Sequence, residues 1–310
     1  MPRFNDFRDL PVLVTGFNRP ELLNNVLSNI ADIGMRNVWI VLDGPRPNNA
    51  QDLVLTKQCR LILETFESML KNRVIVREEN LGCKYGMASA ITWFYQNNPL
   101  GVIIEDDLEF GRDFLAFQFE ALQEFKSARS VGSVTGFLPI AEEINDSSLS
   151  SFKYLSHRYF CAWGWGSWSD RWRNYEVDIK NWRSQIHPLQ LLGKFGYRNF
   201  RYWRKRFDEL EAGKINSWDF QFLFTHFVND WRVITPSVNF IRNVGFGETA
   251  THTIKERQMP SLYSNQTQSR KDSVVQINGK IENIYLQQQF GIKNSVLKKP
   301  FGYYNFSFFD

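Results

Sequence analysis

Five short apolar stretches in the first 135 residues alternate with longer stretches whose apolar residues recur at helical spacing. The apolar stretches are residues 11–15, 38–42, 73–76, 102–104 and 131–135, and we expect each to be a strand. The stretches between them predict helices over about residues 20–30, 50–70, 82–96 and 113–126. Strands and helices that alternate in this way form a parallel sheet with helices on both faces, so the chain is predicted to be an α/β protein.

Polar side chains follow the predicted strands at the points where the strands end. Asn18, Asp43 and Asn80 lie at such points, and the acidic trio Glu105-Asp106-Asp107 follows the fourth strand directly. In open α/β sheets, ligands bind at the carboxyl ends of the strands. Residues 1–140 are therefore predicted to be a nucleotide-binding half, although this pattern does not specify the ligand.

The alternation stops near residue 141, and the rest of the chain is less regular. Residues 141–151 are predicted to be an exposed loop, residues 189–212 a helix, and residues 232–241 strands interrupted at Pro236. We expect residues 141–255 to form a second half. Residues 256–310 are expected to be a tail, which is polar at first and then aromatic and basic.

Three consecutive carboxylates directly after an apolar strand favour a metal site. Mg²⁺ and Mn²⁺ prefer oxygen ligands, and they often bind substrate phosphates as well. Successive side chains that leave a strand point in alternate directions, so Glu105 and Asp107 can face one side while Asp106 faces the other. The alternative is a solvated acidic turn. We favour the metal site because the trio stands at a strand end where ligands bind.

The overall composition limits the classes of partner and the cell compartment. The net charge of +4 is only mildly basic, and no nucleic-acid partner is expected from it. Cys59, Cys83 and Cys161 are odd in number and far apart, which suggests neither a disulfide framework nor a zinc site. The N-terminus lacks the apolar region of a signal peptide, and no stretch approaches the roughly 18 apolar residues of a membrane-spanning helix. We therefore expect a cytoplasmic protein, which can still contact the inner face of the membrane.

Several motifs together resemble the glycosyltransferases of the GT-A fold. The stretch from Glu105 to Phe110, followed by Asp113-Phe114, is similar to the acidic metal motif of the N-acetylglucosaminyltransferase I family. Residues 12–15 and 18–20 resemble the nucleotide-binding start of that fold, and residues 43–44 resemble the end of its second strand. Residues 80–82 resemble the loop that passes the ribose. The resemblance extends over about residues 10–255 and is strongest at the acidic trio.

The resemblance implies an α/β fold of the GT-A type, with a mostly parallel Rossmann-like sheet and a less regular acceptor-side half. It implies a metal-dependent transferase in which Glu105, Asp106 and Asp107 hold Mn²⁺ or Mg²⁺. The donor is then a sugar nucleotide, with a UDP-sugar favoured. The nucleotide contacts fall on Thr15, Asn18, Arg19, Asp43, Asn80 and Gly82.

One segment departs from the N-acetylglucosaminyltransferase I family, which acts in the Golgi. Residues 160–172 (FCAWGWGSWSDRW) are similar instead to bacterial surface-polysaccharide transferases. The N-acetylglucosamine donor and the N-glycan acceptor of the Golgi family therefore do not carry over. This second resemblance implies that residues 141–255 bind a saccharide or a polyprenyl-linked acceptor in bacterial surface polysaccharide synthesis.

An inverting transferase needs a general base that takes the proton of the acceptor hydroxyl. Trp218-Asp219 resembles the motif that carries this base in the related family, and aromatic neighbours help to raise the pKa of a carboxyl group. The alternative is that Asp219 is an N-terminal residue of a helix. We favour Asp219 as the base and therefore inversion, but the sequence also fits a retaining enzyme.

Five further side chains are candidates for ligand contacts. Trp163, Trp165 and Trp218 can stack on sugar rings or pack as an aromatic cluster, and the sequence does not decide between the two. Lys84 can reach a phosphate, or it can be solvated at a helix start. His252 can complete the metal site, where imidazole suits Mn²⁺ better than Mg²⁺, or it can be a surface residue.

A basic and aromatic stretch, residues 198–207, has several interpretations. It can lie on anionic lipid, hold a lipid-linked diphosphate, or bind nucleic acid. A solvated helix face packed by its own aromatic residues is the simplest interpretation. Residues 256–310 are a second candidate for contact with a membrane or a partner.

Two other functions compete with the glycosyltransferase. A sugar-1-phosphate nucleotidyltransferase uses metal and nucleotide on the same scaffold, but the loop at residues 15–20 is short and leads straight into a helix. Those enzymes typically have a Gly-rich, basic loop at this place. A non-enzymatic protein that binds carbohydrate or nucleic acid would account for the tryptophans and the basic stretch. It would not account for the acidic trio at a strand end.

Overall fold

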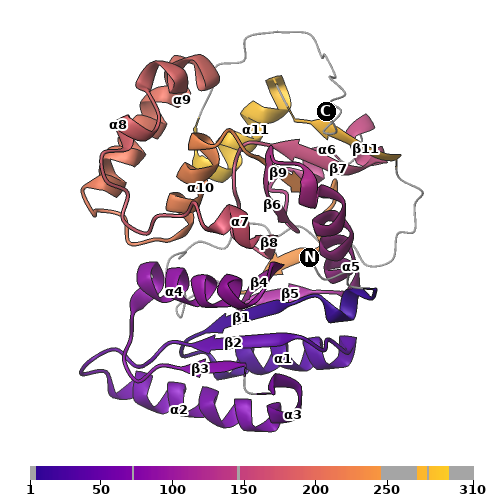
Figure 1. Ribbon diagram of the computed structural model, residues 1–310, viewed down its shortest axis with the longest axis vertical. Coiled ribbons are helices and arrows are strands. Elements are labelled where there is room, and N and C mark those ends of the chain that lie inside the picture. Colours follow the sequence, from indigo (N-terminus) through magenta and orange to yellow (C-terminus); the bar gives the residue numbers. More distant parts are fainter. Residues whose placement is uncertain (1–4, 72, 145–146, 246–270, 278, 293–310) are drawn as a thin grey trace.

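The computed structural model describes residues 5–71, 73–144, 147–245, 271–277 and 279–292 (Figure 1). They form an α/β fold around one large sheet. The strands of this sheet are β1 (Val12–Gly16), β2 (Val38–Leu42), β3 (Val74–Val76), β4 (Leu100–Glu105), β6 (Val131–Thr135), β7 (Phe152–His157), β8 (Trp165–Trp168), β9 (Arg232–Thr235) and β11 (Lys271–Gln276). Strands β5 (Leu108–Phe110) and β10 (Ile241–Asn243) pair with each other.

Helices flank the sheet along the whole described chain. They are α1 (Pro20–Ile33), α2 (Ala50–Thr65), α3 (Glu67–Leu70), α4 (Gly82–Asn97), α5 (Arg112–Glu124), α6 (Ala141–Ile144), α7 (Ser169–Trp172), α8 (Trp182–Gln185), α9 (Pro188–Glu211), α10 (Asp219–Val228) and α11 (Gly279–Phe290). Short 3₁₀ turns lie at Phe7–Asp9, Phe125–Ser127 and Ser148–Ser151. The predicted helices are confirmed to within three residues at their ends, except that the helix expected over 50–70 is interrupted at Phe66 and the helix expected over 189–212 is interrupted at Gly196.

Helix α1 shows how the local sequence determines where an element starts and stops. Pro20 is its first residue, where the missing N–H and the fixed φ of proline cost nothing. Gly34 ends the helix in the left-handed conformation, with φ of 81°, which glycine adopts without strain. Between these ends, Leu23, Val26, Leu27 and Ile30 are buried on one side of the helix.

The predicted strands of the first half are all present. Strands β2 and β6 coincide with the predicted stretches, and β1, β3 and β4 agree with them to within two residues. In the order β4-β1-β2-β3, all three pairings are parallel. The carboxyl ends of these four strands therefore lie along one edge of the sheet.

The sheet is mixed, and it continues past residue 140. Its order is β11-β7-β9-β6-β8-β4-β1-β2-β3, and five of its eight pairings are parallel. Strand β8 lies between β4 and β6 and is antiparallel to both. The expectation of a mostly parallel sheet is therefore confirmed, whereas the predicted division at residue 140 cuts through one sheet. Periodicity did not reveal β8 because this short strand is buried throughout and consists of Trp, Gly and Ser.

The predicted loop 141–151 also differs from expectation. It contains α6 and a 3₁₀ turn, and Ala141, Ile144 and Leu149 are buried. These three apolar side chains give the segment a place in the core, so it is not an exposed loop. Residues 145–146 lie outside the described residues.

Two hydrophobic cores lie on the two faces of the sheet. In β4, Ile103 belongs to one core, and its neighbours Val102 and Ile104 belong to the other, as the alternation of side chains along a strand requires. Residues of α4, α9, α10 and α11 complete the first core, and residues of α1, α2 and α5 complete the second. Among the described residues, no helix has both the length and the apolar composition needed to cross a membrane.

His226 lies inside the first core as a neutral imidazole. Its Nδ1 donates to the carbonyl oxygen of Phe222 at 2.8 Å, and its Nε2 accepts from the hydroxyl of Ser133 at 2.9 Å. Burial lowers the pKa of His226 to about 4. Burial and the charge of Arg232 lower the pKa of His157 to about 3. Both histidines titrate at about pH 6.5 in an unfolded chain, so the unfolded state takes up protons first as the pH falls.

We therefore expect each of these histidines to lower the free energy of unfolding by about 2 kcal/mol between pH 7 and pH 5, with no further effect above pH 7. In His226→Gln, the decrease in the free energy of unfolding from pH 7 to pH 5 should be about 2 kcal/mol smaller than in the wild type. This holds whatever the stability of the variant at pH 7. Urea unfolding of both proteins at pH 7 and pH 5 measures the difference. Equal pH dependence in the two proteins would show that His226 is not held neutral.

Candidate functional site

A cavity of about 820 Å³ lies at the carboxyl ends of the parallel strands β4, β1, β2 and β3. The residue that follows each strand lines it: Phe17 after β1, Asp43 after β2, Arg77 after β3 and Asp106 after β4. Four segments that are far apart in the sequence meet here because parallel neighbours end at the same edge. The edge at which the sequence predicts ligand binding thus contains a cavity.

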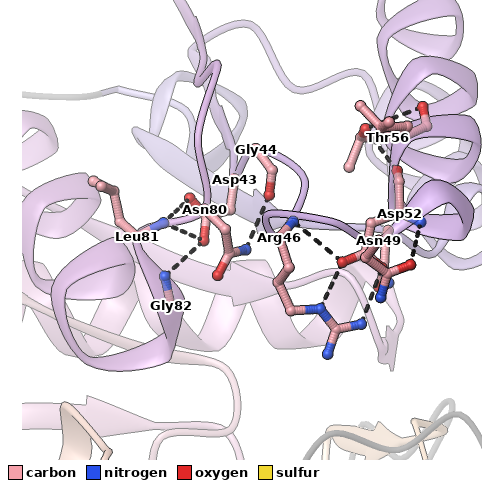
Figure 2. Close-up of polar contacts among 11 residues, drawn as sticks. Asp43, Gly44, Arg46, Asn49, Asp52, Thr56, Asn80, Leu81 and Gly82 are labelled. Atoms are coloured by element: carbon pink, nitrogen blue, oxygen red, sulfur yellow. Dashed lines mark hydrogen bonds and ion pairs between the residues drawn. The ribbon is translucent and has the colours of Figure 1, made fainter.

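Asp43 joins two loops of this edge, the one after β2 and the one that leads into α4 (Figure 2). Its carboxylate accepts hydrogen bonds from the backbone N–H groups of Leu81 and Gly82, both at 3.0 Å. A carboxylate at the start of a helix is also stabilised by the helix dipole. The amide of Asn80 donates to the carbonyl oxygen of Gly44 at 2.9 Å, which adds a second link between the loops.

The backbones of the two loops approach each other so closely that only glycine fits at position 44. A Cβ on Gly44 would lie 2.5 Å from the backbone nitrogen of Glu79. Arg77 reinforces the contact, since its guanidinium lies 3.3 Å from Asp43 and also donates to the carbonyl oxygen of Gly86 at 2.9 Å. These contacts make the two loops one continuous wall of the cavity.

Asp52 anchors the far end of the loop after β2 (Figure 2). Its buried carboxylate accepts hydrogen bonds from Arg46 at 2.9 Å and from Asn18 at 2.8 Å. The backbone N–H of Asp52 donates to the side-chain oxygen of Asn49 at 3.0 Å. The hydrogen bond from Arg46 is the main reason that the pKa of Asp52 lies below its usual value. Asn18, predicted as a nucleotide contact, points to Asp52 and does not line the cavity.

The acidic trio lines the cavity together with Arg19. The Nη1 atom of Arg19 lies 2.8 Å from Asp107 Oδ2 and 3.5 Å from Asp106 Oδ1, so the guanidinium bridges two of the three carboxylates. Burial and the charge of Asp107 raise the pKa of Asp106 to about 7. Burial and both aspartates raise the pKa of Glu105 well above its usual range. Arg19 thus offsets only part of the cost of placing three carboxylates side by side.

The segment that starts with β10 holds Asp107 in place. Asn243 donates to Asp107 Oδ1 at 3.3 Å, and the N–H of Val244 donates to the Asp107 carbonyl oxygen at 2.8 Å. Gly245 lies so close that a Cβ there would stand 2.1 Å from Asp107 Oδ2. Strand β10 reaches this place because it pairs with β5, where Asn243 is opposite Leu108. Residues far along the chain therefore orient the last carboxylate of the trio.

Another part of the cavity lining comes from residues 214–220, at the junction of α9 and α10, and from Trp163. Asp219 is the first residue of α10, and its Oδ1 accepts from the hydroxyl of Ser217 and from the N–H of Phe220, the latter at 2.9 Å. It therefore stabilises its own helix and lines the cavity at the same time. After burial and the two neighbouring aspartates, the charge of Asp219 is the next cause of the raised pKa of Glu105.

The cavity brings together most of the residues predicted for the site. They are Thr15, Arg19, Asp43, Asn80, Gly82, Glu105, Asp106, Asp107, Trp163, Trp218 and Asp219. The hydroxyl of Thr15 is buried and has no hydrogen-bond partner among the described residues. Buried hydroxyl groups are normally satisfied, so this one is available to a water molecule or to a bound ligand.

Besides Asn18, two predicted ligand contacts lie elsewhere. Trp165 is fully buried in the aromatic cluster with Trp218 and Phe222, because β8 is an interior strand covered on both faces. The alternative prediction for it, core packing, is confirmed. The ammonium group of Lys84 pairs with Asp178 at 2.6 Å, so Lys84 fastens α4 to the segment before α8 and does not line the cavity.

Sequence reasoning missed four residues of the site. Arg46, Arg77 and Lys214 bring positive charge to the cavity, and Asn243 orients Asp107. Arg77 could have been found, because it directly follows a predicted strand in the same way as Asp43. The other three depend on tertiary contacts that leave no local signal. His252, predicted as a metal ligand, lies outside the described residues.

The carboxylates suit a hard divalent cation, although they do not form a closed cage. Within the described part of the chain, no group of three or more His, Cys, Asp or Glu side chains is arranged to hold a metal ion. Mg²⁺ and Mn²⁺, however, are commonly bound by one or two carboxylates together with substrate phosphates and water. Asp106 and Asp107 already share one cationic group, the guanidinium of Arg19. They are the residues that would hold such an ion, with the bound ligand completing its coordination.

The cavity carries charge of both signs. Its lining includes the carboxylates of Asp43, Asp219 and the trio, and the cationic groups of Arg19, Arg46, Arg77 and Lys214. This combination suits an anionic ligand that arrives with a metal ion. Searches against models of protein families and among curated protein sequences find no match to the chain.

Arg19→Gln removes the cation that bridges Asp106 and Asp107. At an effective dielectric constant of about 20, two unit charges about 4 Å apart interact by about 4 kcal/mol. The guanidinium competes with a metal ion for the two carboxylates, so its removal should strengthen metal binding strongly. We expect Arg19→Gln to bind Mn²⁺ at least about tenfold more tightly than the wild type when no nucleotide is present.

The loss of the EPR signal of free Mn²⁺ measures this affinity. Arg46→Gln is the matched control, because Arg46 also lines the cavity but pairs with Asp52. Equal Mn²⁺ affinity in Arg19→Gln and the wild type would contradict a cation site at Asp106 and Asp107.

Proposed function

We propose that this protein is a metal-dependent glycosyltransferase of the GT-A type, which moves a sugar from a nucleotide donor to a saccharide or lipid-linked acceptor. One observation carries the proposal. The acidic trio at the end of β4 and the Trp218-Asp219 pair line one and the same cavity. The first set of residues suits a metal diphosphate, and the second suits an acceptor hydroxyl. Their motifs resemble those that serve these two roles in GT-A transferases.

The donor half of the proposed site consists of the strand ends. Asp106 and Asp107 would hold Mn²⁺ or Mg²⁺, and when bound the ion supplies positive charge to the leaving diphosphate. Arg19 is close enough to both carboxylates to contact the same diphosphate. The wall around Asp43 and Asn80 is where we place the nucleoside, and a UDP-sugar is the favoured donor.

The acceptor half consists of residues 214–220 and Trp163. Trp163 is half-buried and lines the cavity, where a sugar ring can stack on it. In the transfer step, the acceptor oxygen forms a bond to the anomeric carbon while the bond from that carbon to the diphosphate oxygen breaks. Asp219 accepts the proton of the acceptor hydroxyl, and the nucleoside diphosphate leaves with the bonding electrons. Attack opposite the leaving group inverts the anomeric centre.

Nucleotide binding by calorimetry tests the donor half. We expect one of UDP, GDP, CDP and CMP to bind in the presence of Mn²⁺, and we expect Asp107→Asn to weaken this binding by at least about 100-fold, because a buried charged ligand is lost. Glu109→Gln is the control, since Glu109 lies two residues away but pairs with Arg242 outside the cavity.

The outcome also separates the competing functions. If no nucleotide binds, with or without metal, a non-enzymatic carbohydrate-binding protein becomes the favoured function. Release of pyrophosphate from a nucleoside triphosphate and a sugar phosphate would favour a sugar-1-phosphate nucleotidyltransferase. Binding that is unchanged in Asp107→Asn would remove the acidic trio from the donor site.

Asp219→Asn tests the proposed base. The variant keeps the size of the side chain and an oxygen for the helix N-terminus, but it cannot take a proton. We expect the turnover number to fall by about 10²- to 10⁴-fold with donor affinity unchanged. Release of nucleoside diphosphate, with bacterial lipid extract as the source of acceptor, measures turnover. Asp170→Asn is the control, since Asp170 is paired with Arg171 and lies outside the cavity. Near-normal turnover in Asp219→Asn would exclude Asp219 as the base.

A further inference from the structure

Helix α9 carries the densest positive charge in the sequence. From Pro188 to Phe207 the chain has six Lys or Arg residues and no Asp or Glu, whereas the whole chain of 310 residues has a net charge of +4. The rest of the protein is therefore slightly negative. Helix α9 lies at the periphery of the molecule, at the opposite end from α2 (Figure 1).

The two sides of α9 differ sharply. Trp203, Phe207 and Leu210 are buried in the first hydrophobic core. Counted from Tyr197, the positions one, four, seven and eight residues later fall within about 120° of the helix circumference. These positions are Arg198, Arg201, Arg204 and Lys205, and all four are exposed. One side of the helix thus holds the fold together, and the other side presents a row of cations.

Three of these four cations are not held in close ion pairs. Among the described residues, Arg201 and Arg204 form no salt bridge, and Lys205 reaches Glu209 only at 3.8 Å with a side chain that is 74% exposed. Arg206, which faces a different side, is the residue that pairs closely with Glu209, at 2.6 Å. Arg201, Arg204 and Lys205 therefore remain available to an external anion.

Two large apolar side chains are exposed in the same helix. Leu189 in the first turn is 68% exposed, and Tyr197 is 66% exposed. Between them, Gly196 interrupts the helix with φ of 72°, and a Cβ there would meet nothing within 4 Å. Leucine gains free energy on entering hydrocarbon, and tyrosine is enriched at the level of lipid headgroups. Neither side chain gains comparably from a phosphate backbone.

We propose that the outward face of α9 after Gly196, namely Tyr197, Arg198, Arg201, Arg204 and Lys205, docks on a bilayer of anionic lipid. The cations attract the headgroups, and Tyr197 enters the interface. Apolar and basic side chains together on one exposed helix favour a lipid surface over nucleic acid. The docking does not depend on the proposed transferase activity, but it fits a lipid-linked acceptor, since residues 214–220 follow α9 directly and line the cavity.

Flotation with vesicles tests the docking. At low ionic strength, we expect the full-length protein to float with vesicles of phosphatidylcholine containing 30% phosphatidylglycerol, and not with pure phosphatidylcholine. Each basic side chain near such a surface strengthens binding about fivefold, so the triple variant Arg201→Gln, Arg204→Gln, Lys205→Gln should bind about 100-fold more weakly. Binding should also fall as salt shortens the Debye length.

The matched control removes the same number of charges from other exposed positions, through Lys57→Gln, Arg129→Gln and Arg173→Gln. It should bind nearly as well as the wild type, and thermal melting verifies that both variants fold. Tyr197→Ser keeps every charge and should weaken vesicle binding. The ratio of its affinity to that of the wild type should be the same at low and high salt. Equal binding by the two triple variants would overturn the proposal, as would failure of the wild type to bind anionic vesicles. Retention on a DNA or RNA oligonucleotide without vesicle binding would assign the face to nucleic acid instead.

Discussion

Repulsion among Glu105, Asp106 and Asp107 is the constraint around which the cavity is arranged. The three carboxylates leave the end of β4 into a partly dehydrated space, where burial and mutual repulsion raise the pKa of Glu105 and of Asp106. Arg19 supplies one compensating charge from the start of α1. Such an arrangement costs stability and performs no structural task that a neutral turn could not perform. Its cost is understandable if the site is completed by a cation and an anionic ligand.

The rest of the site depends on rigid supports that keep these carboxylates in place. Gly245 and Asn243 fix Asp107 from one side, and the loops joined by Asp43 close the other side of the cavity. Both supports depend on close backbone contacts, at Gly245 and at Gly44, where a Cβ would collide with its neighbours. Preorganisation of this kind is what a site needs if the ligand is to meet charges already held in position.

The sequence predicted the parallel part of the fold well because its signals are local. Apolar stretches, helix ends and the residue after each strand are properties of short segments, and they led directly to Asp43 and to the acidic trio. The insertion of β8 between β4 and β6 is a matter of tertiary pairing, which no short segment encodes. The same reason explains Trp165 and Lys84, whose partners Phe222 and Asp178 lie far away in the sequence. Residue type predicted what these side chains could do, but only the fold determines what they face.

Helix α9 connects the proposed membrane-docking face with the cavity. Its inner side is committed to the hydrophobic core through Trp203 and Phe207, so the helix cannot rotate to bury its cations. The C-terminal end of α9 leads into residues 214–220, the part of the cavity lining that carries Asp219. A surface that binds α9 therefore also fixes the position of this lining relative to that surface. A water-soluble acceptor would gain nothing from this coupling. A lipid-linked acceptor would reach this lining from the same surface on which α9 rests, and an anionic bilayer would then orient the cavity as well as concentrate the protein.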